Sequence, residues 1–166
     1  MMGRSLSALI FFLLVGLGPT PQDQPPMPIH WTAAAQSAHP VQPGQKATVL
    51  LTANIDSGWH VYAFPQPPGS PVIPTEITVP EGQPLAFSGD IKPPKAESQM
   101  DPTVGRETDF YENAVTFDLP MKVAKKARAG KQELEIAVRY QACNNRLCLP
   151  PRTEKVETPI EVASRP

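Results

Sequence analysis

Hydrophobic and polar side chains alternate along much of the chain, as in strands that bury one face. In residues 46–55 every second side chain from Val49 to Ile55 is apolar. The longest alternation runs from Val115 to Val123, and residues 133–142 alternate in the same way. The pattern therefore predicts three half-buried strands.

Shorter runs of β-branched and aromatic residues predict three further strands, at residues 59–64, 75–79 and 153–162. Residues 84–107 have a weak pattern, and Pro93-Pro94 and Asp101-Pro102 predict a long irregular connection there. The basic segment at residues 125–131 is predicted to be a solvated turn, and its charge cluster does not by itself indicate a binding partner. No segment has a convincing helical pattern.

Length and composition narrow the fold class. The chain has 166 residues, enough for one domain, and its 22 prolines argue against a helical bundle. Seven or so short strands separated by glycine and proline signals predict an all-β fold, an antiparallel β-sandwich. Charge is nearly balanced, with 15 basic and 16 acidic residues and no basic run, which excludes nucleic acid as a partner.

The first 18 residues have the pattern of a secretory signal peptide. Arg4 is followed by an apolar run of 12 residues from Leu6 to Leu17, shorter than the roughly 20 residues that span a bilayer. Small residues at 16–18 allow cleavage, and an uncleaved membrane tether is the alternative. Residues 19–28 form a proline-rich linker. The sequence thus predicts an exported protein, periplasmic or secreted, without stable membrane insertion after cleavage.

The two cysteines, Cys143 and Cys148, are separated by four residues. Asn144-Asn145 favours a turn, so the segment predicts a β-hairpin with the cysteines facing each other, close enough for a disulfide. Closing a loop of roughly six residues contributes only about 2 kcal/mol by chain entropy. Such a disulfide would stabilise the fold only weakly.

Strand parity places Cys143 with Arg139 and Gln141 on the polar face, unless a bulge before the turn reverses it. That placement predicts a reachable disulfide suited to exchange. An oxidising compartment, in contrast, favours a structural disulfide. Both interpretations stay open on these residues alone.

Three sequence elements together resemble a known family: Gly58-Trp59-His60-Val61-Tyr62, Asp109-Phe110-Tyr111, and Tyr140-Gln141-Ala142-Cys143 with Cys148-Leu149-Pro150-Pro151. They resemble the N-terminal periplasmic domain of the bacterial thiol:disulfide interchange protein DsbD, over roughly residues 29–163. The resemblance implies an immunoglobulin-like sandwich that relays electrons from a membrane donor to exported, thioredoxin-like oxidoreductases, and a link to cytochrome c biogenesis. The spacer between the cysteines is slightly shorter than in the best-known member. No transmembrane domain follows in the sequence, so the donor is expected to be a separate polypeptide.

The resemblance also implies roles for individual residues. Cys143 and Cys148 would be the redox pair, with Cys148 forming the mixed disulfide with a partner and Cys143 as the resolving thiol. Phe110 would be a cap over the pair, although an exposed cap and a buried plug are both compatible with its position. The residues expected to line the site are Asp109, Tyr111, Tyr62 and His60.

Two charged residues would act on a thiolate in opposite directions: Arg146 would favour it and Asp109 would disfavour it. If the chain is an enzyme, it is a thiol-disulfide oxidoreductase of the relay type. One alternative is a non-catalytic sandwich adaptor with a structural disulfide. Another is a copper-handling module in which Met100 or His60 joins the cysteines, although their spacing matches no recognised metal motif. No cofactor and no metal is predicted, and a zinc site lacks ligands.

Overall fold

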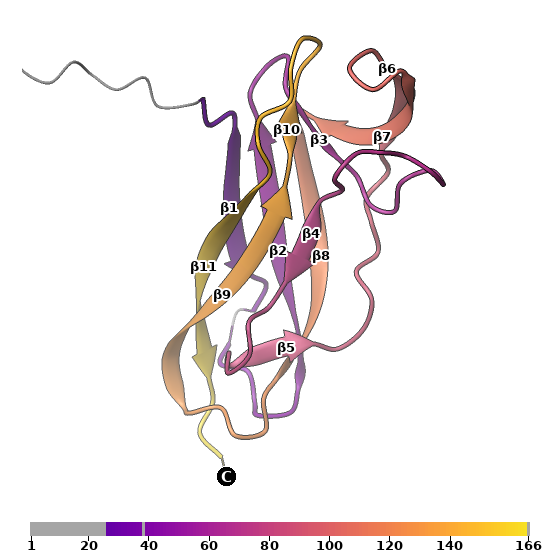
Figure 1. The fold of residues 1–166 in the computed structure, drawn as a ribbon. Coiled ribbons are helices and arrows are strands. Elements are labelled where there is room, and N and C mark those ends of the chain that lie inside the picture. Colours follow the sequence, from indigo (N-terminus) through magenta and orange to yellow (C-terminus); the bar gives the residue numbers. More distant parts are fainter. Residues whose placement is uncertain (1–25, 38, 166) are drawn as a thin grey trace, which may run out of the picture.

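The computed structural model describes residues 26–37 and 39–165, which contain eleven strands and no helix (Figure 1). The strands are β1 (Ile29–Ala35), β2 (Lys46–Ile55), β3 (His60–Tyr62), β4 (Glu76–Thr78), β5 (Leu85–Phe87), β6 (Glu97–Asp101), β7 (Arg106–Glu112), β8 (Ala114–Val123), β9 (Gly130–Tyr140), β10 (Ala142–Cys143) and β11 (Arg152–Val162). All ladders between named strands are antiparallel.

The strands form three sheets. Two of them, in the orders β1-β2-β8-β5 and β11-β9-β4, make the layers of a sandwich. The third, β10-β3-β7-β6, occupies the upper end of the molecule in Figure 1. β9 runs into β10 with only Gln141 between them, so the second and third sheets meet there. The fold is the all-β, immunoglobulin-like sandwich that the sequence predicts.

The alternating segments build the main core. β2 pairs with β8 so that Leu51 lies opposite Phe117, and both side chains are fully buried. The Phe117 ring packs against three other aromatic rings, with centroid distances of 6.2 Å to Trp31, 5.7 Å to Phe64 and 5.5 Å to Tyr111. The predicted strand at 46–55 is confirmed residue for residue.

The two central strands of the β10-β3-β7-β6 sheet, β3 and β7, bury apolar side chains on both faces. Successive side chains of a strand point to opposite faces. Val61 of β3 and Tyr111 of β7 belong to the main core, whereas Tyr62 and Phe110 belong to a second, smaller cluster with Cys143. This second face carries the candidate site.

The structure corrects the interpretation of two segments. Residues 29–35 form β1, which the weakly patterned sequence Ile-His-Trp-Thr-Ala-Ala-Ala did not indicate. Residues 84–107, expected to be irregular, contain β5, β6 and the start of β7. β6 is an outermost strand whose first four residues are exposed, so it has no hydrophobic alternation to detect.

The predicted signal peptide and most of the predicted linker lie outside the described residues. Pro28, at the end of that linker, accepts a 2.8 Å hydrogen bond from the backbone of Asp56 and so begins the folded domain. Within residues 26–37 and 39–165, no helix has the length and apolar character needed to cross a membrane.

Candidate functional site

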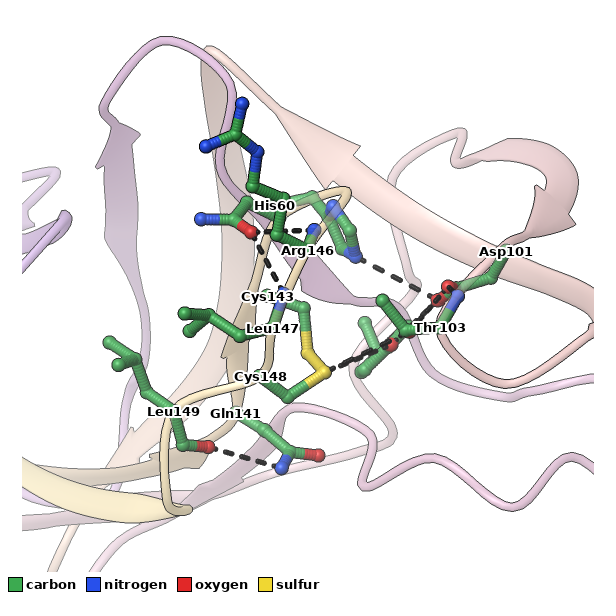
Figure 2. The surroundings of a disulfide bond; sticks show 11 residues. His60, Asp101, Thr103, Gln141, Cys143, Arg146, Leu147, Cys148 and Leu149 are labelled. Carbon is green, nitrogen blue, oxygen red and sulfur yellow. Dashed lines mark hydrogen bonds and ion pairs between the residues drawn. A yellow bond between two sulfur atoms is a disulfide. The ribbon is translucent and has the colours of Figure 1, made fainter.

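Cys143 and Cys148 are joined by a disulfide with a Cα–Cα distance of 4.0 Å, and they pair as an antiparallel bridge (Figure 2). The intervening turn is closed by a 2.9 Å hydrogen bond from the Asn144 N–H to the Leu147 carbonyl. The Asn144 side-chain oxygen also accepts hydrogen bonds from the backbone of Arg146 and Leu147. The predicted hairpin is therefore confirmed, and asparagine forms its turn as expected.

The predicted parity of Cys143 is right, but its predicted exposure is wrong. Tyr140 and Ala142 face the main core, so Cys143 points to the opposite face of the sheet. That face is covered, and Cys143 is 0% exposed. Cys148 is only partly buried, which makes its sulfur the more accessible of the two.

The second cluster holds the disulfide in an apolar setting. Tyr62 and Phe110, cross-strand partners in β3 and β7, pack with Cys143, and Val72 and Cys148 complete the group. Phe110 is 2% exposed and lies within strand β7. It is a buried plug behind the disulfide and not an exposed cap.

The chain segment that reaches the front of Cys148 is the turn between β6 and β7. Thr103 Oγ1 lies 4.0 Å from the Cys148 sulfur. The turn is held by Asp101, whose Oδ1 accepts a 2.8 Å hydrogen bond from the Thr103 N–H and a 2.5 Å bond from its hydroxyl. The Gly105 N–H donates to the Asp101 carbonyl at 2.8 Å. We call residues 101–106 the cover turn.

Asp101 is buried and also contacts Tyr62 of β3. Its Oδ2 accepts a 2.7 Å hydrogen bond from the Tyr62 hydroxyl, and the same hydroxyl oxygen lies 3.7 Å from the Cys148 sulfur. Burial raises the pKa of Asp101, but the hydrogen bonds from Thr103 and Tyr62 favour its charged form and leave the pKa below the usual value. Burial, followed by the Asp101 contact, raises the pKa of Tyr62. Asp101 is thus a carboxylate and Tyr62 a neutral donor.

His60 lies on the same face as the disulfide. Its ring is 5.3 Å from that of Tyr62 and 5.1 Å from that of Phe110, centroid to centroid. Its Nε2 atom is 3.9 Å from Asp101 Oδ2, too long for a hydrogen bond. Burial lowers the pKa of His60, while the nearby carboxylates Asp101 and Glu112 raise it.

The other residues predicted to line the site lie elsewhere. Tyr111 faces the main core, donates to the Pro94 carbonyl at 3.2 Å, and has its pKa raised to about 12, mainly by burial. Asp109 lies on the same face as Tyr111 and contacts Gln66 through its backbone. The acid beside the disulfide is therefore Asp101 and not Asp109. Figure 2 shows the Arg146 guanidinium directed away from the two sulfur atoms.

Asp101 and Thr103 are the site residues that sequence reasoning missed. They lie 40 or more positions before the cysteines, in a stretch expected to be irregular. The available signal was the turn composition Asp101-Pro102-Thr103-Val104-Gly105, which is typical of a tight connection between paired strands. In the described ranges, no group of three or more His, Cys, Asp or Glu residues is arranged to hold a metal ion.

Residues 30–160 match the family model of the N-terminal domain of the thiol:disulfide interchange protein DsbD. A similar solved structure is the N-terminal periplasmic domain of ScsB from Proteus mirabilis, with a TM-score of 0.51 and 17% identity. The alignment covers 78% of this chain and 45% of that chain, so this chain spans less than half the length of the solved ScsB domain. No curated protein sequence matches. With the disulfide in its hairpin and the family match over most of the sequence, the chain belongs to the DsbD N-terminal domain family, whose chemistry is thiol-disulfide exchange.

Proposed function

We propose that this chain is an exported relay domain that passes electrons between a membrane-embedded or thioredoxin-like donor and exported oxidoreductases of the thioredoxin type. The observation that carries the proposal is the asymmetry of the disulfide: Cys143 is fully buried, and Cys148 is partly accessible behind a short turn. The periplasmic origin of the ScsB domain and the apolar run at residues 6–17 support an exported location.

In this proposal the thiolate of a partner attacks the sulfur of Cys148. A mixed disulfide forms between Cys148 and the partner, and Cys143 leaves as the thiolate. The partner's second thiol then releases the reduced domain. The reverse sequence oxidises the domain and reduces the partner. Burial of Cys143 supports its role as the internal, resolving thiol.

The cover turn would regulate access to Cys148. It contacts the site through side chains, because Thr103 faces the sulfur and Asp101 binds Tyr62. A thioredoxin-like partner must displace residues 101–106 to reach the sulfur, and displacement breaks the Tyr62–Asp101 hydrogen bond. The protecting role proposed for Phe110 by resemblance is thus better supported for this turn.

An apolar contact for the partner lies next to the sulfur. Leu147, immediately before Cys148, is 48% exposed, and Met100, immediately before Asp101, is 66% exposed. Together with Met27 they are the large apolar side chains that stand out on the surface of the described residues. An isolated exposed apolar residue is ordinary, but two that flank an accessible sulfur favour a docking surface.

Trapping tests the proposal directly. Cys143→Ser retains Cys148 and should form a stable mixed disulfide with a thioredoxin-like protein that lacks its own resolving cysteine. Cys148→Ser should form none, because its remaining thiol is buried. The double serine variant is the control. Electron transfer at the wild-type rate by the double variant would overturn the proposal.

The reduction potential separates the relay from the alternative of a structural disulfide. Equilibration with glutathione should give a value between those of thioredoxin and protein disulfide isomerase, roughly −270 to −180 mV. A value below about −300 mV would mark a structural disulfide resistant to reduction and would favour the adaptor.

A further inference from the structure

His60 is the direct cross-strand neighbour of Cys143. In the β10–β3 ladder Cys143 pairs with His60, and in the β3–β7 ladder His60 pairs with Glu112. Directly opposed residues of an antiparallel pair lie on one face of the sheet, with Cβ atoms about 4.5–5.5 Å apart. The imidazole therefore extends over the same buried face as the internal sulfur.

The imidazole is buried with an unsatisfied nitrogen. Nε2 of His60 has no hydrogen-bond partner among residues 26–37 and 39–165, and the side chain is 8% exposed. Figure 2 shows the ring turned toward Asp101, whose carboxylate lies 3.9 Å from Nε2 and whose side chain is 3% exposed. A buried polar atom without a partner calls for an explanation. One explanation is that the imidazole becomes positively charged only during the reaction, and that this carboxylate is then its partner.

We propose that His60 accepts the proton of Cys143 when the mixed disulfide is resolved, and that Asp101 stabilises the imidazolium that forms. The inference rests on the proposed function, in which Cys143 is the resolving thiol. With the Nε2–H side of the ring facing Asp101, Nδ1 is the free base that takes the proton.

The S–H bond of Cys143 breaks, and its proton moves to Nδ1 of His60. The Cys143 thiolate attacks the Cys148 sulfur, the Cys143–Cys148 bond forms, and the bond from Cys148 to the partner breaks. The partner leaves as a thiolate with the electron pair, so the partner is reduced and the domain oxidised. The imidazolium returns its proton to the departing thiolate or to water.

The groups that surround His60 on the neighbouring strands fit this role. Asp101 of β6 and Glu112 of β7 favour the imidazolium, and Tyr62 on the same strand stays neutral. Burial outweighs the carboxylates and lowers the pKa of His60, so the resting imidazole is neutral and able to accept a proton. The flanking rings of Tyr62 and Phe110 hold it in place.

The test follows resolution without any protein partner. Reduced protein is mixed with an aromatic disulfide reagent that releases thionitrobenzoate in two phases: a first when Cys148 is modified, and a second when Cys143 resolves the adduct. The second phase is recorded against pH for the wild type, His60→Gln and His30→Gln. His30 is the matched control because it also lies beside a carboxylate, Asp56 at 3.3 Å, but is exposed and far along the chain from the cysteines.

We expect His60→Gln to slow the second phase about 100-fold near neutral pH, the lower range of general-base catalysis. We also expect its rate to keep rising with pH beyond the ordinary cysteine pKa of about 8.5, because burial disfavours the thiolate of Cys143, whereas the wild-type rate should level off at lower pH. His30→Gln should match the wild type. An unchanged rate and pH profile in His60→Gln, or equal slowing in both variants, would overturn the inference.

A second measurement covers the case in which His60→Gln folds poorly. In a Cys148→Ser background, the ultraviolet absorbance of the Cys143 thiolate should appear at lower pH with His60 present than in His60→Asn. In a Cys143→Ser background, the same histidine substitution should leave the titration of Cys148 unchanged; equal shifts for both cysteines would overturn the inference. Because neither assay uses a protein partner, a failure of partner trapping with normal resolution kinetics would count against the relay alone.

Discussion

The hydrogen bond between Tyr62 and Asp101 joins strand β3 to the cover turn. The Tyr62 hydroxyl, on the central strand β3, donates a 2.7 Å hydrogen bond to the carboxylate at the start of the cover turn. The same hydroxyl oxygen lies 3.7 Å from the Cys148 sulfur. Opening the cover turn therefore changes the hydrogen bonding of the group that contacts the reactive sulfur.

Asp101→Asn should loosen the cover turn. The amide is uncharged and loses the charge-assisted bonds from Thr103 and Tyr62, so we expect a loss of about 1–3 kcal/mol in the free energy of unfolding. Reduction of the disulfide by dithiothreitol should accelerate, by about tenfold for each 1.4 kcal/mol by which opening becomes easier. Urea unfolding and stopped-flow reduction measure the two effects.

The control for this prediction is Asp109→Asn, because Asp109 contacts its neighbour Gln66 through its backbone. Thr103→Val keeps the Asp101 charge and removes only the hydroxyl, so its acceleration should be smaller. If Asp109→Asn accelerates reduction as much as Asp101→Asn, the cover turn does not control access.

Phe110→Ala distinguishes a buried plug from an exposed cap. The side chain is 2% exposed and packs with Tyr62 and Cys143. Its truncation should lower the free energy of unfolding by about 3–5 kcal/mol, as for other buried phenylalanines. Urea unfolding of the oxidised protein provides the measurement. A change within about 0.5 kcal/mol, typical of surface substitutions, would contradict the buried position.

Stability should fall on mild acidification because of His60. Its pKa in the folded protein lies below the ordinary value of 6.5, so the unfolded chain binds the proton more readily. Neutral His60 contributes fully to the free energy of unfolding above about pH 6.5, and this contribution is lost as the pH falls toward the pKa of His60 in the folded protein. Asp101, whose pKa is also lowered from 3.8, should add a second loss at more acidic pH.

Urea unfolding at a series of pH values tests this sign. His60→Gln should be less sensitive to pH just below 6.5 than the wild type, and His30→Gln should keep the wild-type slope. If the wild-type protein instead becomes more stable on mild acidification, His60 is protonated and paired with a carboxylate already in the resting folded protein.

Leu147→Ser should separate docking from intrinsic reactivity. The side chain is 48% exposed, so its loss should hardly affect stability. The rate of exchange with a thioredoxin-like partner should fall several-fold, while reduction by dithiothreitol stays the same. Equal slowing of both reactions would indicate a change in the turn at residues 144–147 and not in docking.

The strands that the sequence predicts well are those with one buried and one exposed face. The long alternation at residues 115–123 and the hairpin turn at Asn144 are local patterns, and both appear in the structure as predicted. Local patterns also placed Cys143 on the face away from the main core. They could not reveal that this face is itself covered, because the side chains that pack with Cys143, namely Tyr62, Val72 and Phe110, come from other parts of the chain.

The same limit explains the misplaced site residues. Asp109 and Tyr111 adjoin Phe110 in sequence, but strand alternation turns them to the other side of the sheet. Asp101 reaches the Tyr62 hydroxyl beside the Cys148 sulfur because β6 pairs with β7 in a register that sets Asp101 opposite Arg106. That register depends on the pairing of an exposed edge strand, which composition does not specify.

Because the central strands β3 and β7 bury side chains on both faces, neighbouring positions of one short strand can be altered for different purposes. In β3, Val61 supports the main core, while His60 and Tyr62 on either side of it lie on the face that carries the disulfide. A library that varies only the second face could tune redox behaviour while leaving the core side chains intact. The reactivity of the domain is thereby open to engineering and to divergence between relatives without a redesign of the fold.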